Sequence, residues 1–553
     1  MFKKHIVILL FIIITAASLR FYQLESIPSG FHADEAAFGY NAYSILLTGK
    51  DEYGKFMPLT LRSFDDYKGA IYSYIDIPFI GLFGLTEFAV RAPSAVFGVL
   101  LVFLAYMVSY KLSKERNFAL LAAALVAISP ISILLSRVQS DPLVAVFFVI
   151  LGYYFFLLWL EKDNIIYLIL NSALWFISFF TYASPRVFLP VFVFILFIFY
   201  FKKFSLKQKY SFLILAALVI LTGAVLIFGN SGQRFNQLNI FNTPQVMLPL
   251  EEQIREDGTF SPIFLTRLFH NKMLDYSRYL IDNFSQYLSF NFLFIKGGLP
   301  SREIIPNTAF LYLVEFPFLI FGLYKIFSRK IKWGYFIVLW LLAVPAVLSF
   351  AADETPNVHR FYLAILPLEM IVSFGVIQLF KSIKTNKVLY LLFIILVLVF
   401  YAQNLSYFMH QLFVHQPVHR PWNRGFAYKE MVVSLNKYSP EYKKIVITKS
   451  LSSPYIYLLF YSIYDPKKYQ QMGSPRDYEY KGFDKYIFSP NDCPLSAGEK
   501  GLDPIRGEVG VLYVNKGDCL LPKYDVKLLK TIKWKDGSSA FKLAEYKPKK
   551  KNK

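Results

Sequence analysis

The sequence predicts an α-helical polytopic membrane protein with about eleven transmembrane helices and a small extracytoplasmic α/β domain at its C-terminal end. Of its 553 residues, 55% are hydrophobic and 18% are aromatic, which exceeds the apolar share of most soluble domains. Uncharged apolar runs long enough to cross a bilayer follow one another along the chain. From about residue 409 the composition changes, and short strand-like runs replace the long apolar ones.

The charge balance excludes several classes of function. The net charge is +21, but much of the basic excess lies in short Lys/Arg clusters between apolar runs, where it reports topology rather than nucleic-acid binding. No zinc-finger spacing, phosphate loop or dinucleotide-binding glycine pattern occurs at a usable position. The two cysteines, Cys493 and Cys519, offer neither a redox CxxC motif nor a cysteine metal cage.

The first apolar run follows two lysines and can be interpreted as a signal peptide or as an uncleaved first helix. The apolar stretch, which ends near Tyr22, is long for a signal core, and Ala16-Ala17-Ser18 is a poor cleavage site. We therefore expect an uncleaved helix, and both interpretations send the following loop outside.

The predicted spans alternate with two kinds of connection. They cover roughly 5–24, 88–110, 117–136, 141–160, 164–183, 186–201, 209–229, 306–327, 331–351, 359–380 and 386–408. One set of connections is short and basic, which predicts a cytoplasmic location by the positive-inside rule, although Glu161–Asp163 carries little bias. Lys3-Lys4 belongs to this basic set and places the N-terminus in the cytoplasm, and an odd number of spans then places the C-terminus outside.

The other connections are longer and lie outside. The first, at about 25–87, is mixed in charge and contains apolar turns, which predicts short helices along the membrane surface. The loop at about 230–305 is long enough to form a lid over a substrate, or it is a simple connector. Residues 1–408 are therefore expected to form one transmembrane module.

Residues 409–553 are expected to form the outer α/β domain. Strand-like runs occupy 444–448, 510–514 and 524–528, and Asp536-Gly537 predicts a hairpin turn. Cys493 and Cys519 both lie in this domain on the oxidising side, so a disulfide bond between them is plausible but not required. The lysine-rich end, Lys547–Lys553, is expected to be a solvated tail that is able to touch anionic lipid.

Two adjacent acids, Asp34 and Glu35, stand a few residues beyond the first predicted span, in the stretch from Phe31 to Tyr40. Carboxylates at such a boundary are costly unless water, a cation or a substrate satisfies them. The simpler interpretation is that the two acids cap a short helix.

Basic side chains recur on the same outer face, although the positive-inside rule predicts that they should be rare there. They stand at the boundaries of outer helices or inside the first loop: Lys68, Arg91, Arg137 with Asp141, Arg186, and His359-Arg360 after Asp353-Glu354. Any one arginine at a helix end can simply extend to the lipid headgroups. Several together suggest a site for an anionic phosphate, because guanidinium groups bind phosphate bidentately and stay charged.

The ordered set of these motifs resembles the GT-C membrane glycosyltransferases, in particular the branch of protein O-mannosyltransferases and lipid A aminoarabinose transferases (glycosyltransferase family 39-like). The resemblance covers about residues 1–408 and rests on Asp34-Glu35, Lys68, Glu87 to Ala95, Ser136 to Asp141, Tyr182 to Arg186, and His359 to Pro367. It implies a polyprenyl-phosphate-linked sugar donor and transfer outside the cytoplasmic membrane of a prokaryote. Some relatives have prolines after the loop lysine, whereas this chain has Lys68-Gly-Ala-Ile.

The residue types fit a sugar transfer independently of the resemblance. A hydroxyl or amine acceptor, on a glycolipid, glycan or protein, loses a proton when it attacks the anomeric carbon, and Asp34 is the predicted general base. Glu35 is expected to orient the acceptor or the surroundings of Asp34, with Tyr40 as a supporting residue. Cations stabilise the leaving phosphate, and the predicted phosphate ligands are Lys68, Arg91, Arg186 and Arg360. Arg137 and Asp141 are expected to form a supporting pair, with His359 nearby, and the transfer is expected to invert the sugar carbon.

Two questions stay open on the sequence. A divalent cation is possible but not required, with His32, Asp34, Glu35 and His359 as weak candidate ligands. The main rival function is a transporter or flippase for a lipid-linked sugar, although no internal repeat or buried ionisable chain supports it. An O-antigen-type ligase or polymerase is a third possibility that does not predict Asp-Glu after the first span.

Overall fold

The computed structural model describes residues 2–64, 66–228, 240–241, 244–258, 261–300, 302, 305–384, 387–449, 451–472, 480–495, 507–521 and 525–547. The chain divides into two compact units. The first comprises residues 1–22 and 94–411, and the second comprises 23–93 together with 412–553. The boundary falls within one long helix, between Pro93 and Ser94.

The first unit is built from apolar helices, and a helix occupies each of the predicted spans. These helices are α1 (Phe2–Phe21), α4 (Glu87–Ser113), α5 (Arg116–Ile128), α7 (Asp141–Lys162), α8 (Ile165–Thr181), α9 (Ser184–Tyr200), α10 (Leu206–Phe228), α15 (Phe316–Ser328), α16 (Lys332–Leu348), α18 (Ile365–Ile383) and α19 (Lys387–His410). By length and composition, seven helical segments of the described chain can cross a membrane, and they include α1, α4, α7, α9 and α10. The mostly helical multi-span fold is confirmed.

Some of the predicted spans are less regular than expected. The span predicted at 117–136 breaks at Ser129, where α5 ends, and Pro130 begins the short helix α6 (Pro130–Leu135) because proline cannot continue the preceding helix. The span predicted at 306–327 becomes α-helical only at Phe316, after a 3₁₀ turn, η5 (Leu313–Glu315). Pro317 at the second position of α15 is typical of a helix start.

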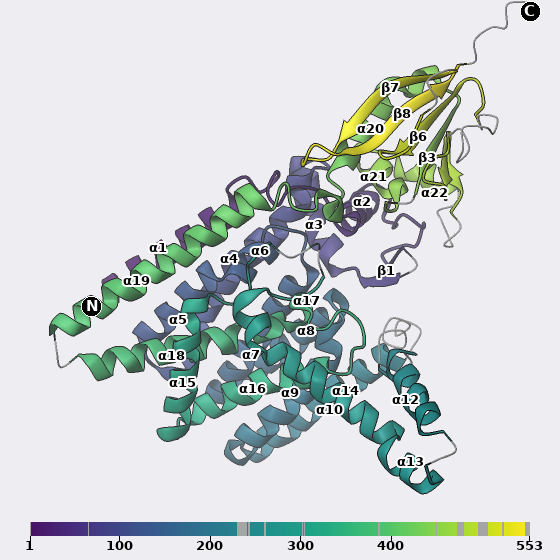
Figure 1. The fold of residues 1–553 in the computed structure, drawn as a ribbon. Coiled ribbons are helices and arrows are strands. Elements are labelled where there is room, and N and C mark those ends of the chain that lie inside the picture. Colours follow the sequence, from purple (N-terminus) through teal and green to yellow (C-terminus); the bar gives the residue numbers. More distant parts are fainter. Residues whose placement is uncertain are drawn as a thin grey trace, which may run out of the picture. The chain divides into compact units, whose positions relative to one another are not determined.

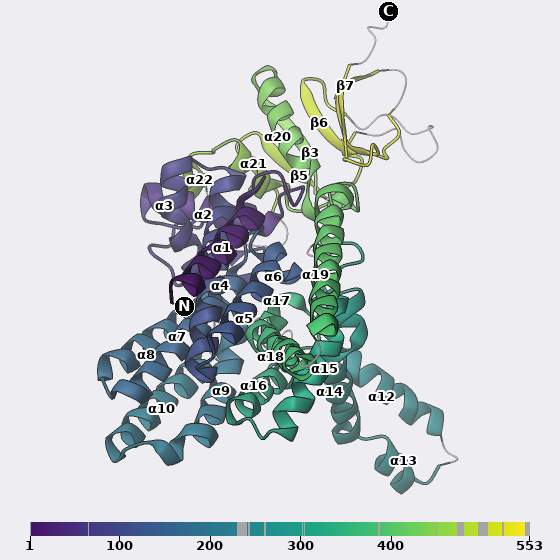
Figure 2. The ribbon, with the colours of Figure 1, turned by 90° about the vertical axis from the view of Figure 1, so that its left-hand side faces the viewer.

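Helix packing in this unit relies on close backbone approaches. Figure 2 shows α7, α8 and α10 side by side, and α9 packs against α10 and α16. A Cβ atom at Gly375 of α18 would lie 1.9 Å from the Phe318 carbonyl oxygen, and one at Gly322 of α15 would lie 2.2 Å from that of Ile371. Glycine at both positions therefore lets α15 and α18 touch backbone to backbone.

The outer loop predicted at 230–305 contains helices. They are α12 (Pro244–Asp257), α13 (Ile263–Phe269) and α14 (Lys272–Leu288), followed by the π-helical turn η3 (Asn291–Ile295). The span predicted at 359–380 starts as α17 (Val358–Phe361) and the 3₁₀ turn η6 (Tyr362–Ala364) before it continues as α18. Leu299 forms a parallel β-bridge with Asn357, so this outer loop is joined to the one that precedes α17.

The second unit combines the first outer loop with the C-terminal domain. The loop folds into α2 (Ala33–Thr48), a hairpin of β1 (Thr60–Ser63) and β2 (Asp66–Gly69), and α3 (Ile71–Phe83). Figure 1 shows α2 beside α3 and α21 (Pro454–Tyr461), and α22 (Pro466–Met472) also packs on α2. Buried side chains of both segments form one hydrophobic core, which includes Phe31, Ala36, Met431, Ile456 and Leu512.

The described part of the C-terminal domain combines a six-stranded mixed sheet with helices, which fits the predicted α/β class. Its strands are β3 (Lys444–Thr448), β4 (Gly482–Phe483), β5 (Tyr486–Ser489), β6 (Val511–Lys516), β7 (Val526–Lys533) and β8 (Ser539–Tyr546), in the order β4-β5-β3-β6-β8-β7. β3 pairs in parallel with β5 and β6, whereas the other pairs are antiparallel. Helix α20 (Ala427–Tyr438) packs on β7 and β8.

The predicted hairpin at Asp536-Gly537 connects β7 and β8, with Gly537 at a φ of 89°. The predicted strand at 524–528 begins at Val526 and runs further, to Lys533. Most of the lysine-rich tail, residues 548–553, lies outside the described residues.

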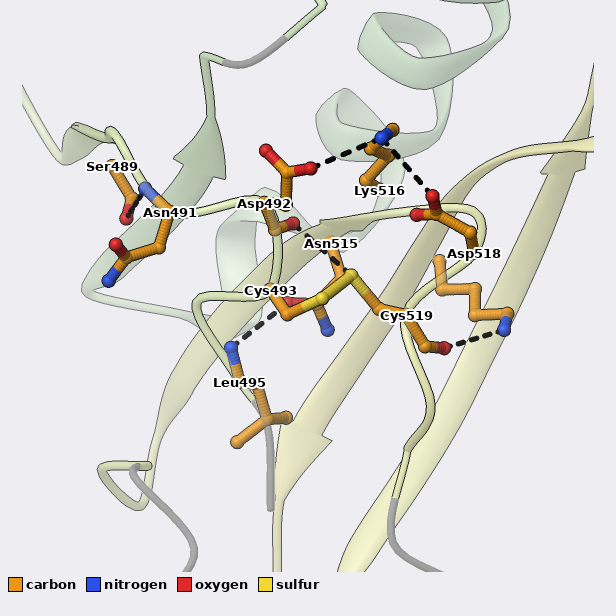
Figure 3. The surroundings of a disulfide bond; sticks show 10 residues. Ser489, Asn491, Asp492, Cys493, Leu495, Asn515, Lys516, Asp518 and Cys519 are labelled. Atoms are coloured by element: carbon orange, nitrogen blue, oxygen red, sulfur yellow. Dashed lines mark hydrogen bonds and ion pairs between the residues drawn. A yellow bond between two sulfur atoms is a disulfide. The ribbon is translucent and has the colours of Figure 1, made fainter. Parts of the chain in front are cut away.

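Cys493 and Cys519 form a disulfide bond that joins the loop after β5 to the turn after β6 (Figure 3). The Lys516 ammonium lies 3.1 Å from a carboxylate oxygen of Asp492 and 3.1 Å from one of Asp518, on either side of this bond. The disulfide bond and these ion pairs therefore hold the loop after β5 against the C-terminal end of β6.

Candidate active site

The Asp-Glu pair lies in the first turn of α2 and takes part in the cap of that helix. His32 is the N-cap residue, and its Nδ1 accepts a hydrogen bond from the Asp34 amide at 3.2 Å. In return, Glu35 Oε2 accepts from the His32 amide at 2.9 Å, which completes a capping box. The capping interpretation is thus correct for Glu35, but it accounts for only part of the contacts of the pair.

Glu35 is held by two arginines. Its Oε1 lies 3.0 Å from Arg91 Nε, and its Oε2 lies 2.6 Å from an Nη atom of Arg424. Glu35 is 2% exposed, and both guanidinium groups are buried. Burial acts to raise the pKa of this carboxyl group, but the charges of Arg91 and Arg424 outweigh burial, so that the pKa of Glu35 is lowered to about 2. Glu35 is therefore a buried carboxylate that is charged at neutral pH and is held in place by two arginines.

Arg91 lies in the first turns of α4 and uses its donors within the protein. Besides Glu35, its Nη atoms donate to the carbonyl oxygens of Leu24, Glu25 and Pro28 at 3.0 to 3.2 Å and to that of Gly30. Its exposed fraction is 0%. Arg91 thus fixes the segment that precedes α2, because its guanidinium group donates hydrogen bonds to four backbone carbonyl oxygens of that segment.

Arg424 comes from the C-terminal part of the second unit and was not predicted. It ends the 3₁₀ turn η8 (Pro421–Arg424) and is followed by Gly425, at a φ of 63°. A Cβ atom at Gly30 would lie 2.7 Å from the Arg424 carbonyl oxygen, so this close approach requires glycine. The signal that could have found Arg424 is a basic cluster, His419-Arg420 and Arg424, just after the last predicted span on the outer side.

Asp34 is the accessible acid of the pair. Its side chain is 28% exposed and forms an ion pair with Lys68, whose side chain is 12% exposed. Lys68 lies on β2, and its ammonium sits over the rings of Phe38 and Phe64, 5.8 and 5.2 Å from the ring centroids. His32 Nδ1 is 3.4 Å from the other Asp34 oxygen. The two neighbouring acids therefore have different surroundings: Glu35 is buried between two arginines, whereas Asp34 is accessible to solvent.

Tyr40, the predicted supporting residue, is buried one and a half turns further along α2. Its hydroxyl group donates to the Tyr464 carbonyl oxygen at 3.1 Å, and burial raises its pKa. Tyr40 therefore serves as a neutral contact between α2 and the C-terminal domain.

Arg137 and Asp141 lie in the first unit. The Nη atoms of Arg137 donate to the carbonyl oxygens of Leu19, Arg20 and Tyr22 at 2.6 to 3.2 Å, at the end of α1. Asp141 begins α7 and accepts a hydrogen bond from the Gln139 side chain at 3.3 Å. Both residues thus stabilise helix ends, which is compatible with the predicted supporting role.

Arg186, His359 and Arg360 also lie in the first unit. Arg186 stands in the first turn of α9, and its Nε donates to the Phe179 carbonyl oxygen at 2.9 Å. Arg360 donates to the Asp353 carbonyl oxygen at 2.7 Å, and His359 precedes it on α17. The Tyr287 hydroxyl group on α14 interacts electrostatically with both Arg360 and Tyr182, so the α8–α9 turn and α17 approach the same side chain.

The predicted site residues therefore fall into two groups. The structure brings Asp34, Glu35, Lys68 and Arg91 together in the second unit, whereas Arg186 and Arg360 belong to the first. The expectation that both groups face one pocket stays a prediction. Within the described parts of the chain, no group of three or more His, Cys, Asp or Glu side chains is arranged to hold a metal ion.

Comparison with known sequences gives one partial family match. The model of the family described as dolichyl-phosphate-mannose-protein mannosyltransferase matches residues 69–228, which include Arg91, Arg137, Asp141 and Arg186. Asp34 and Glu35 precede the matched region. No curated protein sequence matches the chain.

Comparison with solved structures gives a full-length likeness in fold. ArnT from Cupriavidus metallidurans aligns over 97% of both chains in its apo state, with a TM-score of 0.53 and 10% identity. Its complex with undecaprenyl phosphate aligns with a TM-score of 0.52 and 11% identity over the same shares. These alignments, together with the family match, confirm the GT-C resemblance at the level of the fold.

A second solved protein aligns over part of its length. The archaeal oligosaccharyltransferase AglB from Archaeoglobus fulgidus, in complex with an inhibitory peptide and a dolichol-phosphate, gives a TM-score of 0.49 and 12% identity over 83% of this chain. The present chain covers 64% of that oligosaccharyltransferase.

Proposed function

We propose that this protein is an integral membrane glycosyltransferase that moves a sugar from a polyprenyl-phosphate-linked donor to a hydroxyl or amine acceptor on the outer face of the membrane. The partial match to a mannosyltransferase family model and the fold shared with ArnT support this class of enzyme. The ArnT structure that contains undecaprenyl phosphate supports the lipid-phosphate part of the donor. The acceptor is a glycolipid, a glycan or a protein.

The observation that carries the proposal is that two neighbouring acids differ in burial and in their ion-pair partners. Glu35 is buried and paired with Arg91 and Arg424, whereas Asp34 is 28% exposed and paired with Lys68. A general base has to reach the proton it removes, and Asp34 meets this condition whereas Glu35 does not. Asp34 is therefore the base in the proposed reaction, and Glu35 holds the start of α2 in place.

The proposed reaction is a single displacement. The acceptor oxygen or nitrogen attacks the anomeric carbon and transfers its proton to Asp34, while the bond from that carbon to the lipid phosphate breaks. The leaving phosphate is a weak base and needs positive charge rather than a proton from a general acid. Attack opposite the leaving group inverts the configuration at the sugar carbon.

The contacts suggest separate roles for the cations. Arg91 and Arg424 position Glu35, and Lys68 holds Asp34, so these residues are assigned to the acid pair. Arg186 and Arg360 remain the proposed ligands of the donor phosphate, because guanidinium groups bind phosphate oxygens in pairs. Metal dependence is not part of the proposal.

The proposed location is the cytoplasmic membrane of a prokaryote, with the N-terminus inside and the C-terminal domain outside. The basic connections Lys111–Arg116, Lys202–Lys209 and Lys325–Lys332 support this orientation. Transfer on the outer face is consistent with a membrane-bound sugar donor and with the absence of a nucleotide-binding motif in the sequence.

A transfer assay in detergent tests the proposal. Purified protein is given a radiolabelled polyprenyl-phosphate sugar and a panel of hydroxyl and amine acceptors, and both labelled product and released polyprenyl phosphate are measured. Asp34→Asn should lower the turnover rate by about 100- to 10,000-fold, because asparagine cannot accept the proton. Asp536→Asn, the same substitution in the β7–β8 turn, should leave the rate unchanged.

Two outcomes would contradict the proposal. Transfer that survives Asp34→Asn would remove Asp34 as the base. Movement of labelled lipid across vesicles without a new glycosidic bond would favour the rival transporter or flippase.

A further inference from the structure

A second Asp-Glu pair follows the first by about one helix length and is not used in the proposed reaction. Asp51 and Glu52 lie in the loop after α2. The role of Asp51 is local, because its Oδ1 accepts hydrogen bonds from the amides of Tyr53 and Lys55 at 3.0 and 2.8 Å. These contacts shape the turn and explain the aspartate without any function in chemistry.

Glu52 has no such local explanation. Its exposed fraction is 0%, and Asn41 of α2 fixes it from two sides: Asn41 Oδ1 accepts from the Glu52 amide at 3.0 Å, and Asn41 Nδ2 donates to Glu52 Oε1 at 3.3 Å. The other carboxyl oxygen, Oε2, is buried and has no hydrogen-bond partner among the residues that the structure describes. A buried carboxyl group with one unsatisfied oxygen is costly, which indicates a role beyond packing.

Among the described residues, the cation of another element that influences the charge of Glu52 is Lys68. The Lys68 ammonium on β2 interacts electrostatically with Glu52, and the same ammonium forms the ion pair with Asp34. The other titratable groups around Glu52 are Asp51 beside it and the hydroxyl groups of three tyrosines: Tyr40 of α2, Tyr469 of α22, and Tyr480. Lys68 is thus the cation among these neighbours, and it interacts with both Asp34 and Glu52.

We propose that Glu52 is a positioning residue that acts on Asp34 through Lys68. When the carboxyl group of Glu52 is neutral, the Lys68 ammonium stays paired with Asp34. When Glu52 is ionised, it competes with Asp34 for the same ammonium. Burial raises the pKa of Glu52 to about 8, so the neutral form prevails at neutral pH. This inference rests on the proposed function, since it assigns Asp34 as the base.

The coupling follows from the balance of charge among Asp34, Lys68 and Glu52. With Asp34 and Lys68 paired and Glu52 protonated, the three groups carry no net charge. Ionisation of Glu52 would add a second carboxylate charge that acts on the same ammonium, and Lys68 would then be shared between Glu52 and Asp34. The neutral form of Glu52 therefore keeps Lys68 in place on Asp34.

The first test follows the reactivity of Lys68 and needs no enzymatic activity. The detergent-solubilised full chain is treated briefly with acetic anhydride at pH 6 to 10, and acetylation of Lys68 is quantified by mass spectrometry of peptides. Glu52→Gln should make Lys68 at least about 3-fold more reactive above pH 8, because the competing negative charge is gone. Asp51→Asn, which removes the neighbouring carboxylate, is the matched control and should change the reactivity less than 2-fold.

The second test is the pH profile of the transfer assay. In wild-type protein the rate should fall above about pH 8 as Glu52 ionises, and Glu52→Gln should move this fall to higher pH by more than one unit. Glu52→Ala removes the same charge but leaves a cavity, so it should show the same shift even if its rate is lower at every pH. A purely structural role would lower the rate without moving the profile.

The two tests separate failure of this inference from failure of the proposed function. Unchanged Lys68 reactivity in Glu52→Gln at every pH would overturn the inference, whatever the enzyme transfers. A shift in Lys68 reactivity in a protein that transfers no sugar would support the coupling of Glu52 to Lys68 and overturn the proposed function instead.

Discussion

At the scale of single residues, the clamp on Glu35 makes the strongest prediction about stability. Arg424→Gln removes one of the two positive charges that surround this buried carboxylate and should lower the free energy of unfolding by about 3–5 kcal/mol. Lys444→Gln is the control, because Lys444 is partly exposed and its partner Glu508 is exposed; its loss should be below about 1 kcal/mol. Thermal or denaturant unfolding in one detergent measures both. Equal losses would mean that Arg424 is not buried against Glu35.

The raised pKa of Glu52 predicts that the stability of the protein falls as the pH rises. Its pKa is raised from 4.5 to about 8, mainly by burial. Between these values the unfolded chain has released the proton and the folded chain has not, so stability falls as pH rises, by up to about 1.4 kcal/mol per pH unit. Glu52→Gln cannot titrate, and its stability relative to wild type should therefore increase from pH 5 to pH 8. A difference that stays constant over this range would contradict a buried neutral Glu52.

The phosphate role of Arg360 is tested by kinetics rather than by stability. Arg360→Gln removes a guanidinium group that is proposed to hold the donor phosphate, so the KM for the polyprenyl-phosphate donor should rise about tenfold or more. The KM for the acceptor should stay within about twofold, and steady-state rates at varied donor and acceptor concentrations measure both. A rise confined to the acceptor KM would reassign Arg360.

Sequence reasoning reached some of these residues and not others, for physical reasons. The sequence placed Glu35 and Arg91 on the same side of the membrane but predicted Arg91 as a phosphate ligand, because their ion pair and its burial depend on the folded structure. Arg424 could not be placed, because its contact with Glu35 depends on how two segments 389 residues apart fold together. The unsatisfied oxygen of Glu52 is likewise a property of the packed core, and no local pattern in the sequence reports it.

At the scale of elements, the contact between α15 and α18 depends on two glycines. In Gly375→Ala the new Cβ would lie 1.9 Å from the Phe318 carbonyl oxygen, so the helices have to move apart. The free energy of unfolding should fall by about 1–3 kcal/mol, as in other overpacked cores. Gly81→Ala in α3 is the matched control: its Cβ meets nothing within 4 Å, and alanine there should be neutral or stabilising. A Gly375→Ala protein as stable as Gly81→Ala would contradict the backbone contact.

The sequence predicted the helices of the first unit well because a bilayer span needs a long apolar run, which is visible without tertiary information. It predicted less well where helices break. Ser129-Pro130 divides one apolar run into two helices, and Ala309–Tyr312 continues another without being helical. Hydropathy does not distinguish an apolar helix from an apolar segment whose backbone polar groups bond elsewhere.

At the scale of the whole molecule, the sequence does not reveal that residues 23–93 form one compact unit with residues 412–553. The two segments share a single hydrophobic core, in which Phe31 and Ala36 pack with Met431 and Ile456. Such a core depends on contacts between segments that are more than 300 residues apart. Composition and periodicity do not predict such contacts. The acid pair is therefore supported by the C-terminal domain, and truncation of that domain should disturb Glu35 directly.

The disulfide bond provides a test of the proposed orientation of the molecule. Cys493 and Cys519 are bonded, and such bonds persist in oxidising compartments, so the C-terminal domain should lie outside the cytoplasm. In intact spheroplasts, a membrane-impermeant maleimide should label neither cysteine until an impermeant phosphine has reduced the bond, after which both should react. Lys207→Cys in a chain without the native cysteines is the control, because Lys207 lies in the first turn of α10 within the basic stretch Lys202–Lys209 and should react only after the membrane is permeabilised. If the native cysteines instead require permeabilisation and no reductant, the domain faces the cytoplasm, and a transfer reaction on the outer face would have to be abandoned.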